Sequence, residues 1–221
     1  MRRYIWPFIS WGVFSWLQFS ADRWALAFFA TKSVVGTYAV LYQFGFYPLV
    51  LGTNMVQQLV GPILFERVGN GVDPLRVKSG RSLLMKLNVL TALGVLTGTL
   101  TTLFFHELLF SFLVGVEYRH ASYLLPQIML AGGLFAAGQV AALGIIMGTT
   151  TTPLLPVKIG TGILGVLLSF VFSYYKGLDG VIFAAICSAA IYYVWVLIVV
   201  VRKLWNDTHF IHHQEQGKPL S

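Results

Sequence analysis

The stretch "SADR" places a carboxylate and a guanidinium inside an otherwise apolar run of the chain. Asp22 and Arg23 lie in a segment that is largely apolar from Tyr4 to Ala30. A charge at the centre of a bilayer costs on the order of 3 kcal/mol, so such groups usually face a bundle interior or an aqueous cavity. Successive residues point about 100° apart around a helix, so these two side chains do not face each other there. We expect them to contact different neighbours, unless the helix breaks between Ser20 and Arg23.

Uncharged polar side chains interrupt the next apolar runs and add candidates for the same cavity. Asn54 and Gln58 are four residues apart, so they share one face of a helix. Gln43 comes earlier in that segment, and Asn88 lies in the following one. Lys86 lies nearer the end of its segment, where a long side chain can reach the membrane surface. The predicted cavity-lining set is Arg23, Asp22, Asn54, Gln58, Gln43 and Asn88.

The composition is that of an integral membrane protein. The 221 residues are 57% hydrophobic and only 10% charged, and the mean hydropathy is +0.74. Soluble domains carry about 25% charged residues, which this chain could not match on a globular surface. Its length holds roughly six spans of about 20 residues. The single cysteine, Cys187, lies in an apolar run and is expected to be a buried structural thiol.

Continuous apolar segments predict an all-α, polytopic helix bundle. The runs do not alternate as the strands of a membrane barrel do, so helices are the expected spanning elements. The predicted spans are 4–30, 35–65, 83–105, 122–148, 157–175 and 181–201. The first is read as an uncleaved span, because bulky Phe19 stands where a signal peptidase needs a small residue. We predict one six-helix lobe over residues 1–201 and a polar tail over 202–221.

The basic residues indicate how the predicted spans are oriented. With the N-terminus in the cytoplasm and six crossings, ten basic residues lie in inside segments and three in outside segments. The inside set is Arg2, Arg3, Arg67, Arg76, Lys78, Arg81, Lys158, Arg202, Lys203 and Lys218, and the outside set is Lys32, Arg119 and Lys176. This bias predicts that both termini are cytoplasmic. It also accounts for the net charge of +7 without a nucleic-acid partner, because the charges are spread over several loops.

The sequence offers no catalytic motif. It contains no Gly-rich phosphate loop, no HExxH and no nucleophile elbow. Glu107 and Glu117 could meet His106 and His120 at the outer surface, but the predicted outer loops are too short to form a pocket. The histidines of the tail, at positions 209, 212 and 213, lack further ligands at metal spacing. We therefore predict that the chain is not an enzyme and holds no cofactor or metal.

Three segments, in order and covering nearly the whole chain, resemble the polysaccharide flippase family of the multidrug/oligosaccharidyl-lipid/polysaccharide exporter superfamily. The first is "SADRWALAFFATKSVVGTYAVLYQF", with Val35, Gly36 and Tyr38 in a Val-Gly-x-Tyr pattern. The second is "LVGVEYRHASYLLPQIML", similar to a Gly-x-Glu-Tyr segment followed by a Leu-Leu-Pro-like helix start. The third is "GLDGVIFAAICSAAIYYVW", similar to the Gly-x-x-Gly turn into the last helix. No single motif is highly specific, and the resemblance lies in their order.

The resemblance implies one lobe of a two-lobed transporter. Members of the family have two six-helix lobes about a central cavity, and this chain resembles the C-terminal lobe. It implies a lipid-linked oligosaccharide substrate, carried on a polyprenyl pyrophosphate and flipped by alternating access across the bacterial cytoplasmic membrane. Arg23 is then the candidate for the pyrophosphate, and Asp22 either tunes Arg23 or carries a coupling cation. The missing first lobe makes the chain a fragment, a split-gene product or a half-size protein that pairs.

Alternative roles stay open on the sequence. Within the superfamily, the chain could be half of a drug or metabolite antiporter coupled to a cation. From another class, it could be a membrane scaffold subunit without transport activity. Asp22 and Arg23 could also form ion pairs with other helices or reach the membrane surface, and neither role requires a substrate.

Overall fold

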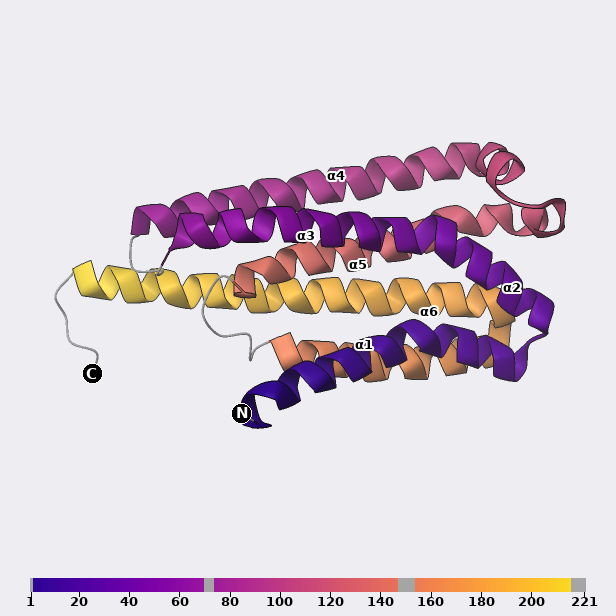
Figure 1. Cartoon of the computed structure of the whole chain (residues 1–221), viewed down its shortest axis with the longest axis horizontal. Helices are drawn as coiled ribbons and strands as arrows, with labels where there is room; N and C mark the ends of the chain where they lie inside the picture. Colours follow the sequence, from indigo (N-terminus) through magenta and orange to yellow (C-terminus); the bar gives the residue numbers. More distant parts are fainter. Residues whose placement is uncertain (1, 70–73, 147–153, 216–221) are drawn as a thin grey trace.

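The computed structural model describes the backbone of residues 2–69, 74–146 and 154–215, and the side chains of 12–13, 16–69, 75–145 and 154–202. No described residue lies in a strand, so the predicted all-α class is confirmed. The elements are α1 (Arg2–Phe29), α2 (Lys32–Leu41), the π-helix η1 (Tyr42–Phe46), α3 (Tyr47–Val68), α4 (Pro74–Leu113), the 3₁₀-helix η2 (Val116–Leu124), α5 (Leu125–Ile146) and α6 (Leu154–Glu215). They form an elongated bundle of nearly parallel and antiparallel helices (Figure 1).

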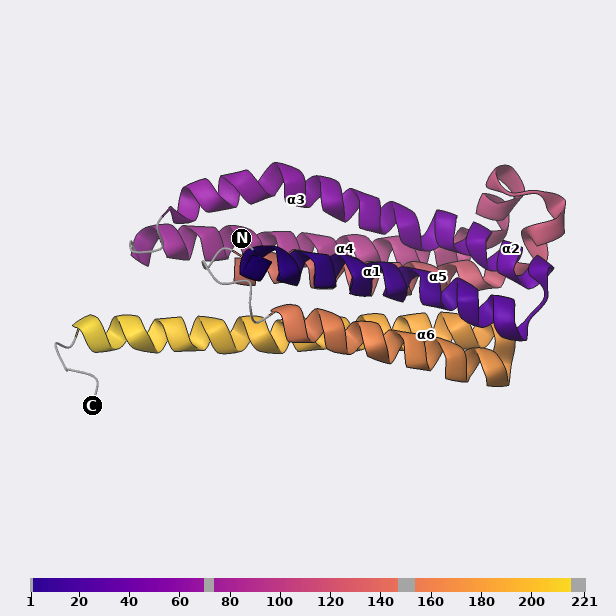
Figure 2. The same cartoon turned by 60° about the horizontal axis from the view of Figure 1, so that its bottom comes forward.

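The helix α6 contains a reversal of the chain at Gly177. This residue has φ 55° and ψ −123°, a conformation that glycine adopts without steric cost. The two arms of α6 lie side by side and run in opposite directions (Figures 1 and 2). A Cβ atom on Gly160 of the first arm would lie 2.8 Å from the ring of Trp195 on the second, which shows how closely the arms pack. Each arm contains one of the last two predicted spans.

Four helical segments of the described residues are long enough and apolar enough to cross a bilayer. Lys32–Val68, Leu75–Leu113, Val116–Ile145 and Leu154–Arg202 are the candidate spans among the described residues. The first of these joins α2, η1 and α3 into one continuous helix. α4 extends beyond the predicted span 83–105 at both ends. Arg76, Lys78 and Arg81 are good helix formers that continue it at the N-terminal end, and the mostly apolar residues 106–113 continue it at the other. α6 likewise continues to Glu215, so the predicted tail is helical over 202–215, whereas 216–221 lie outside the described residues.

The centre of the bundle is α5. It packs against α6, α4 and α3, and 72% of the most apolar stretch of η2 and α5 is buried. The corresponding share for α4 is 6%, so α4 lies at the periphery with an apolar surface. Fully buried side chains of α5 include Ile128, Ala131 and Ile145.

Close contact between η1 and α5 fixes the second long helix to this centre. A Cβ atom on Gly132 would lie 2.8 Å from the Cα atom of Phe46, and one on Gly45 would collide with Ile128. Only glycine allows backbones to approach so closely. Tyr42 and Phe46 stack on the same segment, with ring centroids 4.7 Å apart. The π-turn and its glycine contacts therefore position the residues that flank it.

The chain ends and connections divide between two ends of the bundle. The start of α1, the end of α3, the start of α4 and the end of α6 lie toward one end, which we call the terminal end (Figure 1). The α1–α2 turn, η2 and the Gly177 reversal lie at the other, the hairpin end. Successive long helices therefore run in opposite directions, as expected for predicted spans that are joined alternately at the two ends of the bundle.

Lys158 was counted with the basic residues of the inside segments, although it falls at the start of the predicted span 157–175, and the structure buries it. It lies within α6 and is 4% exposed. Its Nζ atom is 4.4 Å from the ring centroid of Tyr192 and 5.2 Å from that of Phe135. The ten basic residues counted for the inside segments therefore fall to nine. The predicted span 157–175 already contained this residue, and the helix that begins at Leu154 places it one turn inside α6.

Candidate functional site

The Asp22 carboxylate lies between three helices. Its Oδ2 atom accepts a hydrogen bond of 2.6 Å from the hydroxyl of Tyr38 on α2, and its Oδ1 atom accepts one from Ser169 on α6. Because α1 continues without a break through Ser20–Arg23, Asp22 reaches these partners from a regular helix. Both carboxylate oxygens accept hydrogen bonds from hydroxyls, so the packing of α1 against α2 and α6 fixes the position of this group.

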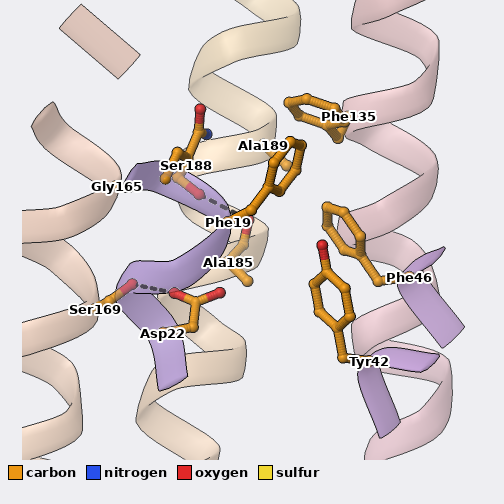
Figure 3. A pocket seen from close by; sticks show the side chains of 11 residues that line it. Phe19, Asp22, Tyr42, Phe46, Phe135, Gly165, Ser169, Ala185, Ser188 and Ala189 are labelled. Carbon is orange, nitrogen blue, oxygen red and sulfur yellow. Dashed lines mark hydrogen bonds between the residues drawn. The ribbon is translucent and has the colours of Figure 1, made fainter. Parts of the chain in front are cut away.

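A small cavity adjoins this carboxylate. Its volume is about 20 Å³, which is close to the room that one water molecule needs. Figure 3 shows Asp22, Ser169 and Ser188 on one side and the rings of Phe19, Tyr42, Phe46 and Phe135 on the other. The remaining lining residues are Gln18, Gly165, Ala185 and Ala189. The polar groups of α1 and α6 thus meet aromatic rings from α1, η1 and α5.

Arg23 lies on a different side of α1, in an open hollow. The guanidinium carbon is 5.1 Å from the ring centroid of Tyr42, a cation–π distance. The hollow has a volume of about 410 Å³ and lies between α1 and the η1–α3 helix. Its lining is Trp16, Phe19, Ser20, Arg23, Tyr42, Gln43, Tyr47 and Val50. Arg23 and Gln43 are exposed, so their donors are available to a solute.

Asn54 and Gln58 lie further along α3, beyond the residues that line the hollow. They follow Val50 at intervals of four residues, so they lie on the face that lines the hollow. Both are exposed. We call the hollow, together with the adjoining face of α3 that carries Asn54 and Gln58, the α1–α3 groove. Arg23, Gln43, Asn54 and Gln58 of the predicted set therefore share one surface.

Asn88 and Asp22 lie outside this groove. Asn88 is on α4, and its Nδ2 atom donates a hydrogen bond of 2.9 Å to the carbonyl of Leu84, one turn earlier. Its Oδ1 atom is buried without a hydrogen-bond partner. Asp22 touches the interior through Tyr38 and Ser169, as described above. The six predicted residues thus divide into a groove set, an interior carboxylate and a half-buried amide on α4.

Sequence reasoning did not identify the partners of Asp22. Tyr38 was quoted only as part of the Val-Gly-x-Tyr pattern, and its position 16 residues after Asp22 gives no periodic signal. Ser169 lies 147 residues away and is one of several serines in apolar runs. The aromatic residues Tyr42 and Phe135 also looked like ordinary apolar residues of a span. Only the packing of α1 between α2 and α6 brings these groups together.

Comparisons with known proteins identify no relative. No family model matches the sequence, and neither a curated protein nor a solved structure matches the chain.

The side chains of the α1–α3 groove are suited to binding a solute. A guanidinium with free donors suits phosphate or carboxylate oxygens, amides suit hydroxyl groups, and the rings of Trp16 and Tyr47 suit apolar or sugar faces. Asp22 has its two hydroxyl donors already in place. The arrangement favours recognition of an anion that carries an apolar or hydroxylated part.

Proposed function

We propose that this chain is one lobe of a membrane transporter that flips a polyprenyl-pyrophosphate-linked oligosaccharide by alternating access. The observation that carries the proposal is the α1–α3 groove, where Arg23, Gln43, Asn54 and Gln58 are exposed on otherwise apolar helices. Such groups are costly against hydrocarbon, so a surface that gathers them is expected to face water or a partner. The resemblance of the three sequence segments to polysaccharide flippases also supports this proposal.

In this proposal the groove is half of a central cavity. Arg23 contacts the pyrophosphate, because a guanidinium can make two parallel hydrogen bonds to phosphate oxygens. Gln43, Asn54 and Gln58 provide donors and acceptors for sugar hydroxyls along α3. Asp22 positions α1 through Tyr38 and Ser169, so that Arg23 points into the groove.

The remaining features of the proposal concern placement in the membrane. α1 and the two arms of α6 each cross the bilayer, which gives six crossings with α2–α3, α4 and α5. The terminal end faces the cytoplasm of a bacterium, because Arg67, Arg76, Lys78 and Arg81 lie near it. A second lobe, from another polypeptide or a second copy, covers the groove. The chain alone then binds the lipid-linked substrate but does not flip it.

A binding measurement tests the proposal without requiring the second lobe. The chain in nanodiscs is titrated with radiolabelled farnesyl pyrophosphate, with farnesol as the uncharged competitor. We expect the chain to bind farnesyl pyrophosphate and farnesol to compete only weakly. Arg23→Ala should lower the affinity about tenfold, since a hydrogen bond to a charged group contributes roughly 1.5–3 kcal/mol.

Lys86→Ala is the matched control. Lys86 is an exposed cation on α4, outside the α1–α3 groove, so its removal should leave the affinity unchanged. Equal weakening by the two substitutions would show a non-specific charge effect and contradict the proposal. Absence of binding to the unaltered chain would also contradict it, and preferential binding of an organic cation would favour the antiporter alternative.

A further inference from the structure

A group of exposed aromatic rings, separate from the α1–α3 groove, lies at the hairpin end. Phe28 and Phe29 are at the end of α1, and Tyr174 and Tyr175 are at the end of the first arm of α6. The exposed fractions are 79% for Phe28, 42% for Phe29, 67% for Tyr174 and 75% for Tyr175. We call these four residues the aromatic patch. They are distant in sequence, so the patch is a product of the fold.

The rings form one continuous surface across two helices. The ring centroids of Phe28 and Phe29 are 5.2 Å apart, those of Phe29 and Tyr174 5.5 Å, and those of Tyr174 and Tyr175 5.2 Å. All three pairs are edge-to-face, with interplanar angles above 70°. This geometry is favourable for aromatic pairs, so the patch is ordered while its outer faces stay exposed.

Charged residues directly follow the patch toward the end of the bundle. Lys176 is adjacent to Tyr175, and Lys32 lies three residues after Phe29; both are exposed. Toward the middle of the bundle, the first arm of α6 exposes the aliphatic side chains of Leu167 and Val171. The order along this surface is therefore aliphatic, aromatic and then cationic.

We infer that the aromatic patch binds the headgroup layer of the lipid bilayer and fixes the depth of the bundle at the hairpin end. Tyr174 and Tyr175 suit this layer, because a tyrosine ring contacts acyl chains while its hydroxyl meets water, and Phe28 and Phe29 extend the apolar part of the patch. Lys32 and Lys176 are placed to meet lipid phosphates, which supplies charge complementarity to this partner. An interface with another protein would not require the graded order from aliphatic to cationic side chains.

The depth of the aromatic patch also sets the depth of Arg23 in the bilayer. Arg23 precedes Phe29 by six residues, so it lies about 9 Å deeper along α1. The guanidinium is then just beneath the headgroup layer, on the side of the membrane that the hairpin end faces. The inference does not depend on which solute is transported, because it rests only on the membrane-spanning arrangement.

Depth-dependent fluorescence quenching tests the inference on the full chain. In a Cys187→Ser background, single cysteines at Phe28, Tyr175, Leu167 or Lys176 carry an environment-sensitive fluorophore. The chain is reconstituted in vesicles of phosphatidylethanolamine and phosphatidylglycerol, with a spin-labelled lipid bearing the quencher either near the headgroup or near the end of the acyl chain. Aqueous iodide serves as the third quencher.

We expect the Phe28 and Tyr175 probes to be quenched most by the shallow lipid, and the Leu167 probe most by the deep lipid. The Lys176 probe should respond most to iodide. If the Phe28 and Tyr175 probes follow iodide as Lys176 does, the patch lies outside the bilayer and the inference is wrong. If neither lipid nor iodide reaches them, a protein covers the patch and the inference is equally wrong.

A pair of double variants tests whether the rings anchor the bundle. Tyr174→Leu with Tyr175→Leu keeps apolar surface but removes the amphipathic rings, whereas Tyr174→Trp with Tyr175→Trp keeps them. With the probe at position 176, the leucine pair should lose part of its iodide quenching as the end sinks, and the tryptophan pair should not. Identical iodide quenching in both pairs would overturn the anchoring role.

Discussion

Two neighbouring residues of α1 occupy opposite environments. The carboxylate of Asp22 accepts hydrogen bonds from Tyr38 and Ser169 in the interior, whereas Arg23 is exposed in a hollow of about 410 Å³. The second long helix is divided in the same way. Gly45 and Phe46 pack closely on α5, whereas Gln43 faces the hollow. Each helix thus has a face that holds the bundle together and a face that is left open.

The difference teaches that a charged residue in a span is not by itself a sign of function. Asp22 and Arg23 are equally unusual in the sequence, yet the carboxylate connects three helices while the guanidinium lies over the ring of Tyr42 in the open hollow. We therefore expect substitutions on the packed face to change stability, and those on the open face to change binding.

Asp22→Ala should have the largest effect on stability. It leaves the hydroxyls of Tyr38 and Ser169 without their acceptor, and a buried unsatisfied group costs about 1–3 kcal/mol. We expect the free energy of unfolding to fall by about 3 kcal/mol, measured by denaturant unfolding in bicelles. Asp22→Asn retains one acceptor oxygen and should lose less. If Arg23→Ala lowers stability as much as Asp22→Ala does, the division between the two faces is wrong.

Gly132→Ala should come next, because it separates η1 from α5. The added Cβ atom would lie 2.8 Å from the Cα atom of Phe46, so one backbone must move. Overpacking of this kind costs about 2 kcal/mol. Gly52→Ala is the matched control, since nothing lies within 4 Å of its added Cβ atom; alanine should stabilise α3 there by up to about 1 kcal/mol. Equal effects at the two glycines would show that the packed face is not tightly packed.

Ser169→Ala should lower the free energy of unfolding by about 1 kcal/mol, the net value of one hydrogen bond. The same substitution in an Asp22→Ala background should have almost no effect, because the acceptor is already gone. A double-mutant cycle measured by bicelle unfolding tests this coupling. Additive losses would mean that Ser169 stabilises α6 through other contacts.

Asn54→Leu combined with Gln58→Leu should have the smallest effect on stability. Both side chains are exposed on the open face, and exposed substitutions usually change stability by less than about 0.5 kcal/mol. The pair should instead weaken binding of a glycosylated isoprenyl pyrophosphate more than binding of farnesyl pyrophosphate. A large loss of stability would show that this part of α3 is a packing surface.

Several parts of the fold followed from the sequence because they depend on local patterns. Continuous apolar runs predicted helices, and the separation of Asp22 from Arg23 around a helix followed from its geometry. The prediction that Asn54 and Gln58 share one face of a helix also followed from helix geometry. Those expectations required no knowledge of what lies next to each helix.

Other parts could not be predicted, because they depend on packing between distant segments. Ser169 became a partner of Asp22 only through contact between α1 and α6. The burial of Lys158 against Tyr192 depends on the reversal at Gly177, which brings the two arms of α6 together. Asn88 looked like a cavity residue by type, but its amide bonds its own helix. Residue type predicts that a polar group needs a partner, and the fold decides which one.

The measurement that tests the central claim most directly is the chemical accessibility of position 23. In a Cys187→Ser background, Arg23→Cys and Leu93→Cys are exposed in vesicles to a membrane-impermeant methanethiosulfonate. Leu93 is 53% exposed on the apolar surface of α4 and should stay unmodified in lipid. We expect rapid modification at position 23, because the α1–α3 groove is open to water. Protection of position 23 to the same degree as position 93 would place Arg23 against lipid and contradict the account.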